Sequence, residues 1–358
     1  MSRDSAGPPS AVRRPPSASA RRTVLTCCQL SGRSGTYAEN VITYEDRTLR
    51  TLADEGRWPE LLGIYRQTRA AAVAEAGEAR AAAGTAALGH LIAQGAPPEI
   101  AVRLFDADGG PGTAAGIGDH DCGPLWEVLA TRHSWLRLAP LLGPATVRRL
   151  VAHTRVLAGE DLSYGAEPDP EGVPLALEPW ELAGWGEGGR VRDYPRAGGS
   201  RCSLLALPAT REGLGPVELP VRGERLAGQR ATGAFGELAD WAQAACVRGA
   251  APDAAAQFAP ARLVTGGYVP FAAAYPVLVQ AGAGVRAYGA ARGRLLVWRA
   301  LVAMTGAGTP DRAEVNALVA RLRCLTWCDP ADELRYLHVA LEDPATGLSW
   351  AVSGDDVE

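Results

Sequence analysis

Apolar residues recur at helical spacing along the first half of the chain. Leu61, Leu62 and Tyr65 follow this spacing, and Pro59 suits the first turn of the helix that contains them. Pro/Gly joints separate one apolar run from the next. The pattern predicts six helices, at about 46–56, 58–65, 78–95, 97–105, 124–136 and 144–157. Short joints between successive helices favour helical hairpins or an irregular bundle.

The helical pattern stops between about residues 159 and 220. Residues 161–174 are rich in Pro, Glu and Gly, and several glycines follow between residues 184 and 199. Residues 202–207 and 217–221 predict short strands. Because a structureless connection of this length is uncommon within a domain, the region is interpreted as a linker or a small irregular β insertion.

Helical spacing returns in the second half. Residues 232–247, 285–305 and 310–326 predict helices, residues 335–342 fit helix or strand, and residues 348–352 predict a final strand. The fold class expected from the whole pattern is therefore mainly α, with helical hairpins or an irregular bundle and a small irregular β segment.

The same pattern suggests a domain organisation. A tail rich in Pro, Ser, Ala and Arg is expected to be disordered, and the last region could form one domain with the first helical region. The predicted divisions are a tail at 1–38, a helical region at 39–158, a linker or β insertion at 159–225, and a C-terminal helical region with a terminal strand at 226–358.

The amino-acid composition excludes several classes of enzyme. The chain has no lysine, so all 36 of its basic side chains are arginine. Arginine keeps its proton and cannot act as a Schiff-base anchor or an amine nucleophile. This excludes P-loop NTPases of the Gly-Lys-Ser/Thr type, typical protein kinases, pyridoxal-phosphate enzymes and Ser-x-x-Lys hydrolases. Scarce Lys, Asn, Ile and Phe beside abundant Ala, Gly, Pro and Arg indicate a GC-rich, actinomycete-like genome.

Charge and cysteine content limit the partners and the compartment. The net charge of −4 gives no general attraction for nucleic acid, and no apolar run approaches the ~20 residues of a membrane helix. The apolar run after Arg21 and Arg22 is too short for an export signal. Seven scattered cysteines favour reduced thiols. We expect a cytoplasmic protein with an unidentified protein partner, without membrane contact and with nucleic acid disfavoured.

One cluster of residues has metal-ligand chemistry. Four neighbouring residues, Asp119-His120-Asp121-Cys122, follow a glycine-rich stretch, and His133 and His153 come later on predicted helices. Zinc accepts nitrogen, sulfur and oxygen ligands in this combination. The spacing matches no zinc signature, however, and an aspartate capping the helix after Pro124 is the simpler explanation. The expectation is no cofactor, with zinc at Asp119, His120, Cys122, His133 and His153 as the alternative.

Three other patterns in the sequence could carry chemistry. Residues 276–287 fit a strand followed by Gly-x-Gly-x-x-Ala and a helix, which is the order of a dinucleotide site, although no second strand with a terminal acid follows. Cys324 and Cys328 would share one helical face and are expected to be buried core residues. The basic stretch is interpreted as a solvated face with ion pairs, and comprises Arg286, Arg292, Arg294 and Arg299.

Spaced aromatic and glycine positions carry a resemblance. They lie at 178–180, 198–201, 287–289, 293–294, 298–301, 326–327 and 337–340. With these positions the chain resembles an uncharacterised actinomycete family of unknown function and similar length. The resemblance spans most of residues 40–350, contains no catalytic signature and implies no activity.

The functional expectation follows from the missing catalytic set. No Gly-x-Ser-x-Gly elbow and no recognisable Cys/His signature occurs in the sequence. We expect a non-catalytic, cytoplasmic protein-interaction or binding protein. A metal-dependent hydrolase built on the Asp-His-Asp-Cys segment is the alternative, and a nucleotide-binding protein is a weaker one.

Overall fold

The structure is a computed structural model. It describes residues 44–106, 123–185, 189–195, 205–239, 241–284, 288–306, 311–328 and 336–355. The chain divides into two compact units, residues 1–51 and 52–358. Helix α1 (Tyr44–Asp54) supplies the described residues of the first unit, and the predicted tail at 1–38 lies outside the described residues.

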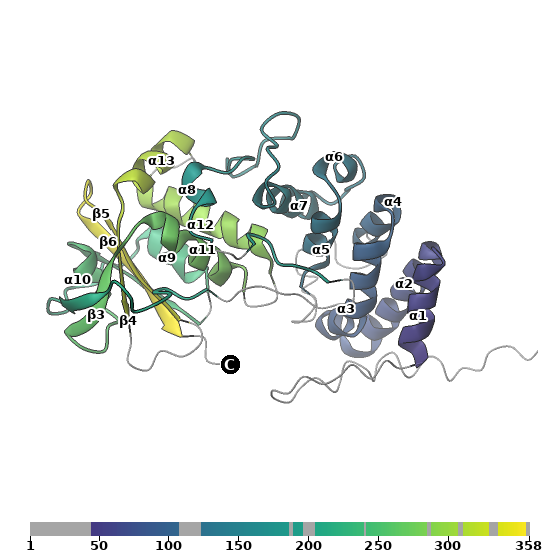
Figure 1. The fold of residues 1–358 in the computed structure, drawn as a ribbon, viewed down its shortest axis with the longest axis horizontal. Helices are drawn as coiled ribbons and strands as arrows, with labels where there is room; N and C mark the ends of the chain where they lie inside the picture. Colours follow the sequence, from purple (N-terminus) through teal and green to yellow (C-terminus); the bar gives the residue numbers. More distant parts are fainter. Residues whose placement is uncertain are drawn as a thin grey trace, which may run out of the picture. The chain divides into compact units, whose positions relative to one another are not determined.

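The first half of the larger unit is built from helices (Figure 1). They are α2 (Trp58–Ala76), α3 (Glu78–Gly95), α4 (Pro98–Ala101), the 3₁₀ turn η3 (Val102–Phe105), α5 (Leu125–Arg132), α6 (Trp135–Leu138) and α7 (Ala145–Leu157). Prolines stand at or next to the predicted helix starts, where their missing N–H costs nothing. Helix α2 packs against α3, α3 against α5, and α5 against α7.

The second half combines helices with a sheet. Its helices are α8 (Pro179–Leu182), α9 (Arg230–Gly236), α10 (Ala251–Ala255), α11 (Phe271–Gly282), α12 (Ala290–Thr305) and α13 (Arg312–Arg321). Its strands are β1 (Gly215–Glu218), β2 (Gln243–Arg248), β3 (Leu263–Val269), β4 (Arg323–Cys328), β5 (Tyr336–Asp343) and β6 (Leu348–Asp355). In the described part of the chain they form one antiparallel sheet of order β1-β3-β4-β5-β6-β2.

The sheet corrects the predicted fold class. Helix accounts for about 49% and strand for about 16% of the described residues, which is an α+β protein and not a mainly α one. The predicted helix at 232–247 is α9 followed by strand β2, and the predicted helix at 310–326 is α13 followed by β4. The final strand predicted at 348–352 is confirmed within β6.

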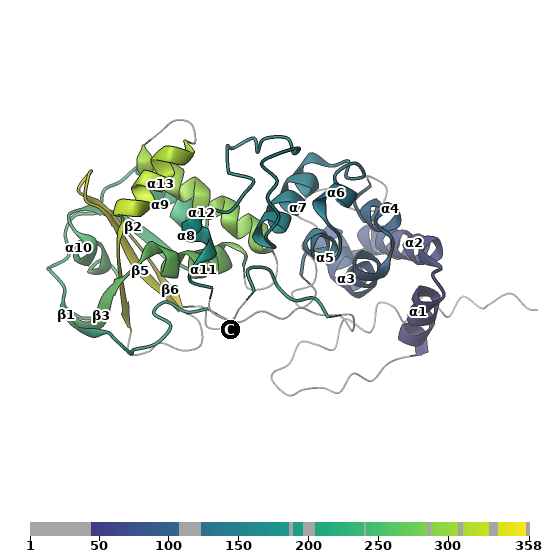
Figure 2. The same cartoon turned by 45° about the horizontal axis from the view of Figure 1, so that its top comes forward.

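Helices cover both faces of the sheet (Figure 2). The short, alanine-rich α10 packs on strands β2, β4, β5 and β6, with Trp327 and Leu325 in the same apolar cluster. Helices α9 and α11 contact the sheet from the other side. This double cover explains why residues 337–343 of β5 are buried without alternation.

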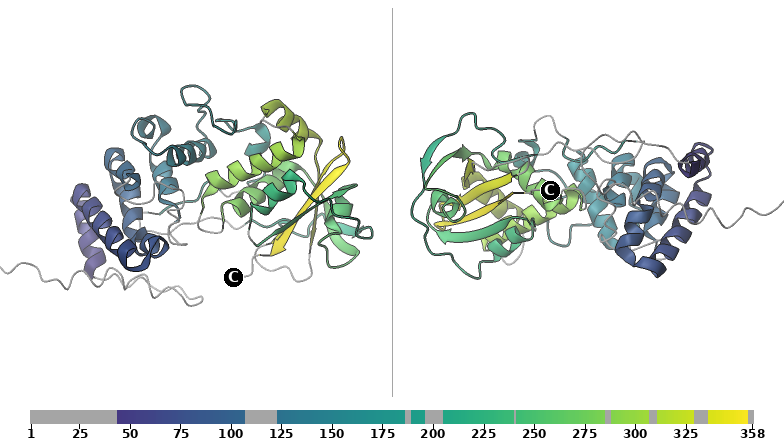
Figure 3. Two further views of the ribbon diagram at one scale, coloured as in Figure 1. Left: turned by 180° about the vertical axis from the view of Figure 1, so that it is seen from behind. Right: turned by 90° about the horizontal axis from the view of Figure 1, so that it is seen from below.

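Helix α12 connects the sheet layer to the first helices. It packs against α9, α11 and α7, and Figure 3 shows α11 and α12 running alongside each other. Their backbones approach closely because two glycines meet there: a Cβ at Gly282 would lie 2.9 Å from the Cα of Gly293. A Cβ at Gly293 would overlap the carbonyl of Val279. Larger residues would push the two helices apart.

A buried carboxyl group holds the start of α12. The backbone N–H of Ala290 donates to Oε2 of Glu127 at 2.6 Å, and the Tyr194 hydroxyl donates to Oε1 at 2.8 Å. Burial raises the pKa of Glu127. Gly289 has φ +77°, and a side chain there would collide with Glu127. Helix α12 is therefore fixed to α5 at its first residue.

No helix within the described ranges has the length and apolar character needed to cross a bilayer.

Candidate functional site

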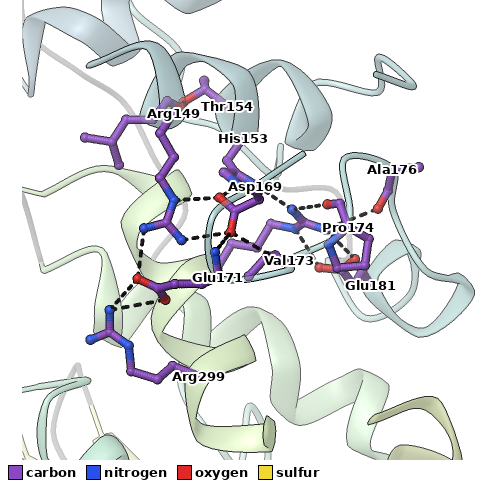
Figure 4. A network of polar contacts seen from close by, with 12 residues as sticks. Arg149, His153, Thr154, Asp169, Glu171, Val173, Pro174, Ala176, Glu181 and Arg299 are labelled. Carbon is purple, nitrogen blue, oxygen red and sulfur yellow. Dashed lines mark hydrogen bonds and ion pairs between the residues drawn. The ribbon is translucent and has the colours of Figure 1, made fainter. Parts of the chain in front are cut away.

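Ionisable side chains, some fully buried and some partly exposed, gather where α7 and α12 meet the segment that joins α7 to α8 (Figure 4). Two come from α7, two from the joining segment, one from α8 and two from α12. They are Arg149, His153, Asp169, Glu171, Glu181, Arg294 and Arg299. We refer to these seven residues as the ionic network.

Asp169 is the acceptor at the α7 end of the network. Arg149 donates to both of its oxygens, at 2.6 and 3.0 Å, and the ring of His153 lies 2.9 Å from Oδ2. The backbone amides of Glu171 and Val173 donate to Oδ1. Burial alone would raise the pKa of Asp169, but the hydrogen bonds from His153 and Arg149 outweigh it and hold the pKa well below its usual range. Asp169 is therefore ionised.

His153 lies between an acid and an arginine. Its Nδ1 is 2.7 Å from a terminal nitrogen of Arg294. A guanidinium only donates, so Nδ1 must accept and the ring proton must sit on Nε2, facing Asp169. Burial lowers the pKa of His153, although the bond to Asp169 opposes the shift. The ring is neutral at pH 7, and both of its nitrogens are occupied.

Arg294 is fully enclosed, and every one of its donors is used. Two N–H groups bind the carboxylate of Glu181 side by side, at 2.8 and 2.9 Å. The others bind His153 and the carbonyl oxygens of Pro174 and Ala176. A guanidinium has five N–H donors. The buried charge is thus both paired and fully hydrogen-bonded, which is the condition for tolerating it inside a protein.

Glu181 receives further donors from the surrounding aromatic residues. The Tyr275 hydroxyl lies 2.6 Å and the Trp298 indole nitrogen 3.0 Å from Oε1, and the backbone N–H of Glu178 donates to Oε2. Burial would raise the pKa of Glu181, but the charge of Arg294 overcomes it and lowers the pKa. The network therefore fastens the segment before α8 to both α7 and α12.

A pocket of about 470 Å³ lies beside the network. Arg149 and Arg299 belong to both. Its lining comes from α7, from α9 and the residues after it, from α11 and the residues after it, and from α12. The lining residues are Thr146, Arg149, Leu150, Gly236, Glu237, Leu238, Ala239, Ala281, Gly284, Tyr288, Arg292, Leu295, Leu296 and Arg299.

The pocket arginines differ in their partners. Arg149 is bonded to Asp169 and, at 3.0 Å, to Glu171. Arg299 reaches Glu171 at 3.1 Å and Glu237 at 2.9 Å. These two guanidinium groups are therefore neutralised by the carboxylates around them.

Arg292 has no such partner among the described residues. Its guanidinium carbon lies 3.9 Å from the ring centroid of Tyr288, a stacked cation–π contact. Its one hydrogen bond is a long contact of 3.5 Å with the carbonyl oxygen of Gly282. Its other N–H groups have no acceptor among the described residues, and its side chain lines the pocket.

The predicted metal residues are only partly visible. Asp119, His120, Asp121 and Cys122 lie outside the described residues. His133 directly follows α5, and burial lowers its pKa. His153 is the network residue whose two nitrogens are already bonded. Within the described ranges, no group of three or more His, Cys, Asp or Glu side chains could hold a metal ion.

The other sequence patterns fall differently than expected. The strand predicted at 276–280 is wrong, because these residues lie inside α11, so the glycine turn joins two helices. Cys324 and Cys328 are buried as predicted, but they lie on strand β4 and not on a helix. The prediction that the basic stretch is a solvated face is wrong for Arg294, which is fully buried.

Sequence reasoning missed most of the network. Arg149, Asp169 and Glu181 belong to no local motif, and the contact from Arg294 to His153 spans 141 positions. Comparisons of the chain with family models, curated proteins and solved structures found no match. The geometry of the site is therefore the basis for assigning a function.

Proposed function

We propose that the chain is a non-catalytic, cytoplasmic binding protein that holds a small ligand in the pocket beside the ionic network. The observation that carries this proposal is the chemistry of the lining. Its ionisable side chains are Arg149, Glu237, Tyr288, Arg292 and Arg299. Catalysis by proton transfer needs a base with a free lone pair in reach of the substrate. Among the described lining residues, neither a histidine nor a cysteine is present, and the carboxylate of Glu237 is paired with Arg299.

The neighbouring histidine does not supply that base. Both nitrogens of His153 are bonded, one to Asp169 and one to Arg294. An Asp–His pair activates a nucleophile only when the second ring nitrogen faces it. Here that nitrogen faces a buried guanidinium, so the pair is not arranged to activate a nucleophile.

The shape of the pocket supports a small-molecule ligand. Its volume of about 470 Å³ falls within the range of about 300–1,000 Å³ that is typical of such sites. Leu150, Leu295 and Leu296 line it with apolar surface, and the arginines add polar groups at defined places.

The test uses a neutral fluorescent probe, N-phenylnaphthylamine, and a variant that fills the pocket. Thr146 is exposed on the first turn of α7 and lines the pocket, so Thr146→Trp places an indole in it. Ala145→Trp is the matched control, because Ala145 is exposed on the same turn and does not line the pocket. Thr146→Trp is expected to weaken binding by about tenfold or more, equivalent to about 1.4 kcal/mol.

The control separates pocket binding from general stickiness. Ala145→Trp is expected to bind the probe like the unmodified chain. Absence of saturable binding, or equal binding by the two tryptophan variants, would refute the proposed function.

A further inference from the structure

We infer that the pocket takes a small organic anion with a flat apolar body, and that Arg292 selects the anionic group. This inference rests on the proposed function, because it names the ligand class of the same pocket. It is carried by the contrast between Arg292 and the other two pocket arginines.

Arg149 and Arg299 are already paired with carboxylates. Arg149 forms a two-pronged pair with Asp169, whose side chain is fully buried. Arg299 bridges Glu171 and Glu237. A ligand that recruited either guanidinium would first have to break these pairs. Their role is to shape the wall.

Arg292 is oriented but not satisfied. The guanidinium lies over the ring of Tyr288, and the only described residue that accepts from its N–H groups is Gly282, at 3.5 Å. The side chain is half-buried, so a partner for its charge gains from partial exclusion of water. The planar fork of N–H donors matches carboxylate, sulfonate and phosphate oxygens.

The other lining residues indicate the shape and polarity of the rest of the ligand. Leu150, Leu295 and Leu296 present apolar side chains to the same cavity. The ring of Tyr288 and the guanidinium stacked on it add a flat wall. An aromatic or otherwise flat group fits between such surfaces and gains from burial of its apolar area.

The carboxylate of Glu237, which also lines the pocket, does not reverse the preference for an anionic ligand. Glu237 is 58% exposed and lies 2.9 Å from Arg299, so its charge is paired and screened by solvent. The lining therefore contains three guanidinium groups and a single carboxylate. An anionic ligand can pair with the guanidinium of Arg292, whereas a cationic ligand would have to compete with Arg299 for the carboxylate of Glu237.

The test compares two probes that differ by one sulfonate: N-phenylnaphthylamine, which is neutral, and anilinonaphthalene sulfonate, which is an anion. Arg292→Gln is expected to weaken binding of the sulfonate by about tenfold or more, and to weaken the neutral probe by no more than about twofold because only part of the flat wall is lost. Arg292→Lys keeps the charge but loses the flat fork, so about a threefold loss is expected. Arg248→Gln removes the same charge at an exposed position of β2 outside the pocket and is the matched control.

The outcomes separate the inference from the proposed function. A much larger loss of sulfonate binding than of neutral-probe binding in Arg292→Gln, with Arg248→Gln unaffected, supports the inference. If both probes bind and Thr146→Trp blocks them, but Arg292→Gln weakens neither or both equally, the pocket stands and the anion preference is overturned. If neither probe binds, or Thr146→Trp has no effect, the proposed function itself fails.

Discussion

The proton of His153 is placed by its two neighbours. Arg294 can only donate, so it forces the opposite nitrogen to carry the hydrogen that Asp169 accepts. A second proton would bring a positive ring against a buried guanidinium. The residue therefore resists charging for a reason that is visible in the geometry and independent of its sequence neighbours.

The stability of the protein is expected to fall in mild acid because of His153. Its pKa in the folded state is lowered, whereas the unfolded value is about 6.5. Below about pH 6.5 the unfolded chain therefore binds a proton that the folded chain does not. The contribution to the free energy of unfolding is complete above that pH and is lost progressively as the pH falls from it toward the lowered folded pKa.

His153→Gln tests this expectation, because glutamine offers one acceptor and one donor without titrating. Urea unfolding from about pH 7 to about pH 5 should show a smaller decline in this variant. His133→Gln is the comparison, since burial also lowers the pKa of His133 although no carboxylate of the described residues bonds to it. A decline as steep as in the unmodified chain would contradict the assignment of the slope to His153.

Arg294 and Arg299 are expected to differ strongly in their effect on stability. Arg294→Met leaves the carboxylate of Glu181 buried without its partner and should cost about 3–5 kcal/mol of unfolding free energy. Arg299→Met removes the same kind of side chain where it is 45% exposed, and should cost less than about 1 kcal/mol. Chemical denaturation of both variants measures the difference. Similar losses would show that the enclosed pair is not special.

At the scale of elements, the contact between α11 and α12 depends on the absence of side chains. Gly293→Ala puts a methyl group onto the backbone carbonyl of Val279. Because a carbonyl in a helix cannot move aside, the loss should be about 1–3 kcal/mol. Gly233→Ala in α9 meets no atom within 4 Å and should gain about 0.5–1 kcal/mol from helix propensity.

Thermal or urea unfolding of these two alanine variants gives opposite signs if the glycine contact is as close as described. Stabilisation by Gly293→Ala would show that the helices can separate at no cost. The pocket provides a second readout, since Ala281 and Leu295 line it from either side of this contact.

Elements were predictable where their contacts are local. The helices of the first half follow from apolar spacing and proline starts, because helical hydrogen bonds join residues four apart. The sequences of strands β2 and β4 predict helix, because a strand covered on both faces is an apolar run without alternation. Helix α11 was partly predicted as strand because it contains valines and an internal Pro276.

At the scale of the whole molecule, the sheet and the ionic network are both built from contacts between residues far apart in the sequence, and such contacts are hard to predict from sequence. Strand β2 pairs with β6, so that Cys246 stands opposite Trp350. The network similarly joins His153 of α7 to Arg294 of α12. Such partners lie far apart in the sequence and follow no local pattern, so the basic stretch predicts a solvated face although its Arg294 is fully buried.

The span of the network also bears on the order in which the chain matures. The contact between His153 and Arg294 closes a loop of 141 positions, and closing long loops slows folding. During synthesis at about 5–20 residues per second, α12 follows α7 by roughly 7–28 s. Over that interval the first helices exist without their ionic anchor, and one face of α7 must stay soluble until its partner is made.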